Sequence, residues 1–280
     1  MPIIKRDNAD LYFEETGTGE AIITTHGLSE SSRYWRLTGV AEMLGKTFRV
    51  ISMDMRAHGK TVVHGEPCGF DDETMGADIT FVADQLGIDK FHLLSHATGG
   101  FVAARYAMTH SNRLLSLILT DTTSSTSNID AKPDSIDRYN DKFARTFEGS
   151  TWDDAFTRLR KSPGPFFRGI MESERSEEML QTARKVMEGS DRNTLAAFIR
   201  SFYTDPDRRI EGLRNITCPT LIIYGEKDDL FIETSKLMAQ EIPDSKLIEY
   251  EGIGHMTAIE APQRLSRDIL DFISRQSTPE

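Results

Sequence analysis

The feature that most constrains the fold is a regular alternation of short apolar runs with longer segments of helical periodicity. Short apolar runs rich in β-branched residues are typical of buried strands. Eight runs read as strands: Ile3–Arg6, Leu11–Glu15, Ala21–Thr25, Phe48–Met53, Phe91–Leu94, Leu114–Leu119, Thr220–Tyr224 and Lys246–Glu249. Helical patterns lie between most of them, which predicts an α/β fold with a mostly parallel, doubly wound, eight-stranded sheet. In such sheets ligands bind at the carboxyl ends of the strands.

The alternation is interrupted once, between the sixth and the seventh of these strands. Residues 129–205 carry helical patterns without strands, and the segment from 131 to 205 holds 10 of the 24 aromatic residues. That segment contains 13 basic and 13 acidic residues, so the whole net charge of −11 belongs to the rest of the chain. We therefore predict one body, 1–128 and 206–280, with an inserted helical cap, 129–205, over an apolar pocket.

Charge and cysteine content exclude several functional classes. A net charge of −11 disfavours a nucleic-acid partner and an anionic membrane surface, since both require basic faces. Cys68 and Cys218 form no CxxC motif, and no apolar run approaches the length of a membrane helix. We expect a cytoplasmic protein that acts on a small molecule. The oligomeric state stays open, with a homodimer as one option.

Chemically competent residues follow the strands in a recognisable order. His26-Gly27-Leu28 follows the third strand, Ser95-His96-Ala97-Thr98-Gly99 the fifth, Asp228 the seventh and Gly254-His255 the eighth. This order resembles the α/β-hydrolase family over essentially the whole chain. In that family the nucleophile stands in a sharp strand-to-helix turn, G-x-S-x-G, and an acid and a histidine follow it. Here Ala97 stands at the nucleophile position, and a methyl group cannot attack a carbonyl carbon.

The resemblance implies a role for each of the other positions. His255 would be the base and Asp228 the acid that orients it; Asp121 and Asp229 are alternative acids. The backbone N–H groups of Leu28 and Thr98 would form the oxyanion hole. His26 would support its loop.

Candidate substrate-binding residues are Phe166, Phe167 and Trp152 of the predicted cap. Arg56 lies in the stretch Asp54-Met55-Arg56-Ala57-His58-Gly59, which resembles the family's D-x-R-G-H-G. It is predicted to join an internal ion-pair network, with a substrate carboxylate as the alternative partner. The histidines form no H-E-x-x-H motif and no cluster with cysteine, so we expect no metal and no cofactor.

The resulting hypothesis is a hydrolase for an ester or lactone of a mid-sized apolar or aromatic compound, using Ser-His-Asp chemistry. Its serine is replaced by Ala97, which would leave the chain inactive or strongly impaired. Three alternatives stay open. The chain could be a natural serine-less hydrolase in which His255 activates water, similar to carbamate or aminoacrylate hydrolases. It could be a cofactor-independent oxygenase or C–C hydrolase, or a ligand sensor without catalysis.

Overall fold

A computed structural model describes residues 3–125, 133–149 and 151–276. Its centre is one sheet in the order β1-β2-β4-β3-β6-β7-β8-β9, and β5 pairs with β2 outside this path. The pairings β1–β2, β2–β4 and β2–β5 are antiparallel, and all others are parallel. The strands are β1 (Ile3–Arg6), β2 (Ala9–Thr16), β3 (Ala21–Thr25), β4 (Arg49–Met53), β5 (Val62–Val63), β6 (Phe91–His96), β7 (Leu114–Thr120), β8 (Thr220–Gly225) and β9 (Ser245–Tyr250).

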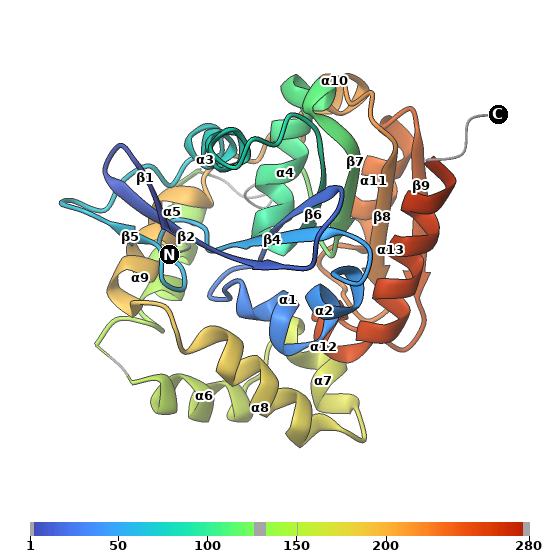
Figure 1. The fold of residues 1–280 in the computed structure, drawn as a ribbon. Coiled ribbons are helices and arrows are strands. Elements are labelled where there is room, and N and C mark those ends of the chain that lie inside the picture. Colours follow the sequence, from blue (N-terminus) through green and yellow to red (C-terminus); the bar gives the residue numbers. More distant parts are fainter. Residues whose placement is uncertain (1–2, 126–132, 150, 277–280) are drawn as a thin grey trace.

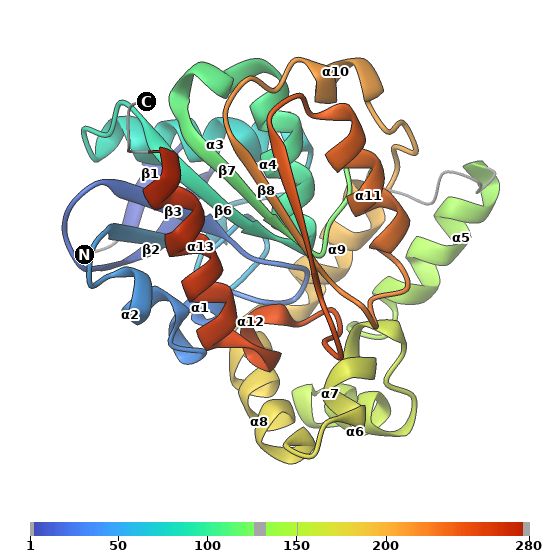
Figure 2. The same ribbon diagram turned by 90° about the vertical axis from the view of Figure 1, so that its right-hand side faces the viewer.

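Helices cover both faces of the sheet, as its two buried faces require (Figures 1 and 2). One face carries α3 (Asp72–Gln85), α4 (Ala97–His110), α10 (Ile210–Arg214) and α11 (Ile232–Glu241). The other carries α1 (Arg33–Leu37), α2 (Val40–Leu44), α12 (Thr257–Glu260) and α13 (Pro262–Gln276). Two apolar clusters, one on each side of the sheet, form the core. None of the described helices is long and apolar enough to cross a membrane.

A further group of helices lies at the edge where the parallel strands end; in Figure 1, α6, α7 and α8 are at the bottom and α5 and α9 at the left. It comprises α5 (Pro133–Ala144), α6 (Trp152–Lys161), α7 (Arg168–Glu172), α8 (Ser176–Met187) and α9 (Arg192–Phe202), with a 3₁₀ turn at Pro165–Phe167. Apolar side chains of α6, α7 and α8 join the cluster of α1 and α13, whereas α5 and α9 pack on each other. The predicted boundary between residues 128 and 129 falls in 126–132, outside the described residues.

The architecture confirms the predicted fold class and differs from the prediction in detail. The eight expected strands are present, and β5 is a two-residue addition that the sequence analysis missed. The stretch from Tyr34 to Leu44, which has helical spacing in the sequence, forms two short helices, α1 and α2, separated at Gly39, whose φ is 80°. A left-handed residue cannot continue a right-handed helix, and glycine adopts it at little cost.

The start of α4 packs very tightly against its neighbours. A Cβ atom placed on Gly100 would lie 2.5 Å from Oγ1 and 2.6 Å from Cβ of Thr122. Thr122 in turn donates a hydrogen bond to the Ala97 carbonyl at 2.7 Å. This close approach fixes the turn from β6 into α4 against the loop after β7.

We expect Gly100→Ala to lower the free energy of unfolding by about 2 kcal/mol or more, because the added methyl group overpacks a buried contact. Gly76→Ala is the matched control within α3, where a new Cβ would meet Tyr106 at an ordinary 3.4 Å. That change should be neutral, or stabilising by about 0.5–1 kcal/mol, because alanine has the better helix propensity. Urea unfolding of both variants measures the difference. Equal effects of Gly100→Ala and Gly76→Ala on the free energy of unfolding would show that the turn from β6 into α4 is not tightly packed.

Candidate active site

A buried histidine–carboxylate pair lies at the carboxyl edge of the sheet. Nδ1 of His255, in the loop after β9, donates a 2.8 Å hydrogen bond to Oδ2 of Asp228, in the loop after β8. Both side chains are buried. Of the alternative acids, Asp229 is largely exposed and bonds Arg168, and Asp121 lies buried nearby. In this arrangement the carboxylate holds the imidazole in one tautomer and leaves Nε2 to act as a base.

The loop of His255 is held by a second carboxylate. Glu260 accepts the backbone N–H groups of Gly254 at 2.8 Å and Met256 at 3.1 Å, one on each side of His255. Aromatic rings then enclose the imidazole: the ring centroid of Phe166 lies 4.8 Å away and that of Phe231 5.2 Å away. These contacts fix the orientation of His255 in an apolar surrounding.

Ala97 occupies the sharp turn between β6 and α4. Its φ is 45°, a left-handed value that is uncommon for a residue other than glycine and is typical of the strained nucleophile turn. The N–H of Gly99 donates to the carbonyl of His26 at 2.9 Å and so ties this turn to the loop after β3. The backbone therefore has the form that presents a nucleophile, while the side chain is a methyl group.

Asp121 adds a second buried carboxyl group beside the pair. Its φ is 50°, and its Oδ1 accepts the Gly225 N–H at 2.9 Å, whereas Oδ2 has no partner among the described residues. Burial, followed by the nearby charge of Asp228, raises the pKa of Asp121 well above its ordinary value. Asp121, Asp228 and His255 place one possible ligand atom each within 4.8 Å of one another. A cation at this position would compete with the hydrogen bond between His255 and Asp228.

The loops after β3 and β4 form a supporting network of hydrogen bonds and one buried ion pair. His26 bonds the Gly27 carbonyl through Nδ1 at 2.9 Å and accepts the Met55 N–H at Nε2. Burial lowers the pKa of His26 to about 4. Arg56, the candidate for a substrate carboxylate, instead pairs with buried Asp78 at 2.7 and 3.1 Å and with Asn8 at 2.9 Å. Its guanidinium is thus engaged inside the protein in an ion pair, as predicted, and is not free for the alternative partner, a substrate carboxylate.

The aromatic residues predicted to bind substrate occupy different environments. Phe166 lies against His255. Phe167 is buried in the cluster of α1, α2 and α13, and Trp152 packs between Phe147 and Phe156. Of the three, only Phe166 contacts the histidine–carboxylate pair.

Several residues at the site were missed by the sequence analysis. They are Glu30, Phe231, Tyr203 and, as a side chain with a role of its own, His96. The hydroxyl group of Tyr203, just after α9, lies 2.6 Å from that of Thr98. Glu30 and Phe231 stand in loops at the carboxyl edge, so inspection of every loop residue there could have identified them. Tyr203 comes from the helical segment and carries no local signal.

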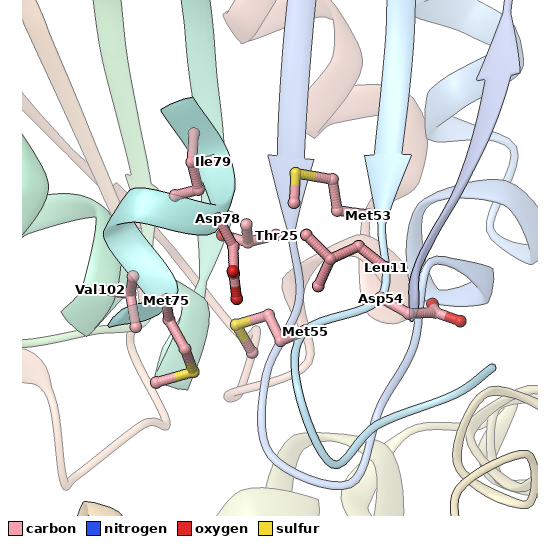
Figure 3. Close-up of a pocket in the computed structure, with 9 residues that line it drawn as sticks. All are labelled: Leu11, Thr25, Met53, Asp54, Met55, Met75, Asp78, Ile79 and Val102. Carbon is pink, nitrogen blue, oxygen red and sulfur yellow. The ribbon is translucent and has the colours of Figure 1, made fainter. Parts of the chain in front are cut away.

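A small crevice between β2, β4, α3 and α4 is separate from this site (Figure 3). Met53, Met55, Met75 and Asp78 are among its lining residues. The space in it that a water molecule could occupy is about 10 Å³, which is room for at most one water molecule. It cannot hold a substrate.

Fold and site together define a class of protein, and comparison with known proteins agrees. A family model described as "alpha/beta hydrolase fold" matches residues 20–262. The chain belongs to the α/β-hydrolase family.

Individual relatives are distant but cover the full length. The chain is 25% identical to the non-heme chloroperoxidase CPO-A1 of Kitasatospora aureofaciens, over 98% of this chain and 100% of that protein. It is 25% identical to the bifunctional esterase/perhydrolase DCH of Acinetobacter calcoaceticus, over 97% and 98% of the two chains. A thermophilic esterase from Thermogutta terrifontis superposes with a TM-score of 0.76 and 25% identity, covering 96% of this chain and 95% of that one. Family members thus include esterases.

The raised pKa of Asp121 generates a prediction about stability. A carboxyl group whose pKa is raised in the folded state stabilises the fold below its unfolded pKa, and this contribution is lost as the pH rises. Asp121→Asn removes the titration. The free energy of unfolding of the variant should rise relative to that of the unsubstituted chain. The rise should be about 1.4 kcal/mol for each pH unit over which the Asp121 carboxyl is protonated in the folded state but ionised in the unfolded state.

Urea unfolding between about pH 4 and pH 8 measures this gain. Asp229→Asn is the control, because its side chain is 61% exposed and should give no comparable trend. A constant difference between Asp121→Asn and the unsubstituted chain at every pH would contradict the prediction.

Proposed function

We propose that this site is built to hydrolyse a carboxylic ester or lactone of a mid-sized apolar or aromatic compound, and that Ala97 closes its acyl-enzyme route. The observation that carries the proposal is the 2.8 Å bond between His255 and Asp228 beside a turn that keeps a φ of 45° at Ala97. The esterase relatives at 25% identity support the bond type, and the rings of Phe166 and Phe231 around His255 support an apolar substrate.

With serine at position 97, the chemistry would follow the order of an acyl transfer. His255 Nε2 takes the serine proton while the oxygen attacks the carbonyl carbon, and Asp228 stabilises the imidazolium. The N–H groups of Leu28 and Thr98 receive the negative oxygen. His255 then gives the proton to the leaving oxygen as the carbon–oxygen bond breaks. Water repeats the sequence on the acyl-enzyme and releases the acid.

With alanine at position 97, the acid–base pair can act only on water. His255 Nε2 would accept one proton from a water molecule as its oxygen attacks the substrate carbonyl, and would return that proton to the leaving oxygen. This second candidate function is favoured by the intact and buried pair, since the methyl group of Ala97 offers the imidazole no proton of its own. A cofactor-independent oxygenase or a C–C hydrolase, the other enzymatic alternatives, would use the same pair of His255 and Asp228.

We expect Ala97→Ser to raise the hydrolysis of activated aryl esters and simple lactones at least about 100-fold, because a missing nucleophile typically costs several orders of magnitude in kcat. Mass spectrometry should detect a transient acyl group on the serine. The controls are Ala97→Gly, which keeps the turn without a nucleophile, and Ala97→Ser combined with His255→Gln. No gain over a broad panel of esters, lactones, amides and carbamates would refute the ester hydrolase.

The role of His255 is tested in the unsubstituted chain. If the chain hydrolyses any member of the panel through activated water, His255→Gln should lower kcat about 10²–10⁴-fold. His64→Gln, a half-exposed histidine after β5 that pairs with Asp10, should leave it unchanged. Measurable turnover that survives His255→Gln would contradict the water route. Tight ligand binding without turnover in either the alanine or the serine form would favour a sensor over a hydrolase.

A further inference from the structure

The site contains a further buried carboxyl group, that of Glu30, which neither the family chemistry nor the mechanism above uses. Glu30 lies in the loop after β3, two residues beyond Leu28, and is only 1% exposed. Its Oε2 accepts the Gly27 N–H at 2.6 Å. In the part of the chain that the structure describes, no lysine or arginine lies within ion-pair distance of Glu30. A buried carboxylate without a cation is costly and tends to take up a proton.

The group that faces Glu30 is His96, the last residue of β6. Its Nδ1 lies 3.0 Å from the Thr120 hydroxyl, and that hydroxyl lies 3.5 Å from the Ser95 carbonyl. The hydroxyl can donate its hydrogen to this carbonyl, so it accepts a hydrogen bond from the N–H group at His96 Nδ1. Nε2 of His96 then carries a lone pair. It is buried, has no hydrogen-bond partner among the described residues, and lies 3.6 Å from Glu30 Oε1.

The protonation states that fit this geometry complement each other. Burial lowers the pKa of His96 well below its ordinary value, and His255 adds to the effect. Burial also raises the pKa of Glu30 to about 8. A protonated Glu30 points an O–H group at the lone pair of His96, whereas a carboxylate would place negative charge against it.

Glu30 and His96 join the two loops that would form the oxyanion hole. Glu30 belongs to the loop of Leu28, and His96 directly precedes Ala97 and Thr98. A Cβ atom placed on Gly27 would lie 2.9 Å from Glu30 Oε2, 3.1 Å from the Ala97 methyl group and 3.1 Å from His96 Cδ2. The three residues therefore border the same small space.

We propose that protonated Glu30 is a positioning residue that holds the Leu28 loop against the turn from β6 into α4. Its Oε2 accepts the Gly27 N–H, and its Oε1, 3.6 Å from His96 Nε2, faces that nitrogen as an uncharged O–H group. We call this arrangement the clasp. The oxyanion hole keeps its shape while Glu30 holds its proton, and it loosens when the proton leaves. The inference rests on the proposed hydrolytic function, because it assigns a task to the Leu28 and Thr98 N–H groups.

The other titratable groups near Glu30 and His96 are two tyrosines, a histidine and an aspartate. Tyr34 of α1 stacks on His96 with ring centroids 4.6 Å apart, and the Tyr203 hydroxyl lies 2.6 Å from that of Thr98. Burial raises the pKa of both phenols. His255 lies 4.9 Å from the His96 ring, and Asp121 Oδ2 lies 3.8 Å from His96 Nδ1.

Glutamine at position 30 separates this inference from an acid–base role. Its amide can accept the Gly27 N–H and present an uncharged N–H group to His96 at every pH, so it imitates the protonated state permanently. In the Ala97→Ser background, Glu30→Gln should keep kcat within about threefold at neutral pH, since the bond to the Gly27 N–H survives and the group that faces His96 stays uncharged. It should also abolish the fall in activity above the pKa of Glu30, about 8. Glu30→Ala should lose about 10²-fold in kcat, comparable to removing one oxyanion donor.

The protonation of Glu30 can also be followed through protein stability, which does not require an active enzyme. Because the pKa of Glu30 rises from 4.5 to about 8 on folding, its stabilising contribution is complete below 4.5 and is lost as the pH approaches 8. The unfolding midpoint of the unsubstituted chain should fall relative to that of Glu30→Gln over this interval and run parallel to it above. Glu20→Gln is the matched control: Glu20 also contacts a histidine, His92 at 2.9 Å, but at the amino ends of the strands and half exposed.

The outcomes distinguish this inference from the proposed function. If Glu30→Gln is as impaired as Glu30→Ala, or if its unfolding midpoint shows no pH-dependent difference from the unsubstituted chain, the clasp is refuted, whether or not Ala97→Ser hydrolyses esters. If Ala97→Ser hydrolyses nothing, the proposed function fails. The stability difference then still decides whether Glu30 carries the proton that the clasp requires.

Discussion

The close packing of the β6–α4 turn against the loops after β3 and β7 is the constraint on which the rest of the site depends. Gly99 and Gly100 have no room for a side chain, since added Cβ atoms would come within 2.6 Å of Thr25 Oγ1 and 2.5 Å of Thr122 Oγ1. This fixes where α4 begins, which residue stands at the tip of the turn, and how its backbone N–H groups point. The histidine–carboxylate pair is useful only because this turn is held in front of it.

Burial also shifts the pKa values of several ionisable groups near the turn in the direction that favours their neutral forms. Burial lowers the pKa values of His26 and His58, to about 4 and about 3, and raises those of Glu30 and Asp121. The net charge of −11 therefore says little about the site. Desolvation strengthens the electrostatic interactions of the charges that remain there. This suits the pair of His255 and Asp228, in which the carboxylate must stabilise a transient imidazolium.

The parts of the site that could be predicted are those that depend on sequence order. Parallel strands end at one edge, so Asp228 and His255 could be expected to meet although 27 positions separate them. The position of Ala97 followed from its small neighbours in the same way. The internal ion pair of Arg56 was also predicted, but its partner, Asp78, was not, because Asp78 lies on a separate helix, α3, and no local pattern links the two.

The parts that could not be predicted are side-chain directions within helices and loops. Phe166 and Phe167 are adjacent, yet one lies against His255 and the other in the core, and composition cannot separate them. Tyr203 reaches Thr98 across 105 positions, and only the docking of α9 brings it there. Glu30 was missed for a different reason: a glutamate in a polar loop is normally solvated, and its burial becomes visible only once the loop is folded against His96.

Ala97 shows how far the geometry of the turn is independent of the nucleophile. A left-handed φ costs an alanine about 1–2 kcal/mol, and a methyl group forms no hydrogen bond that could offset this cost. The turn is nevertheless kept, because the bond from Gly99 to His26 and the contact of Gly100 with Thr122 determine it from both sides. The scaffold, and not residue 97, therefore defines the position from which an attacking oxygen would act. Serine at that position would inherit it, and a water molecule would have to be held there by other groups.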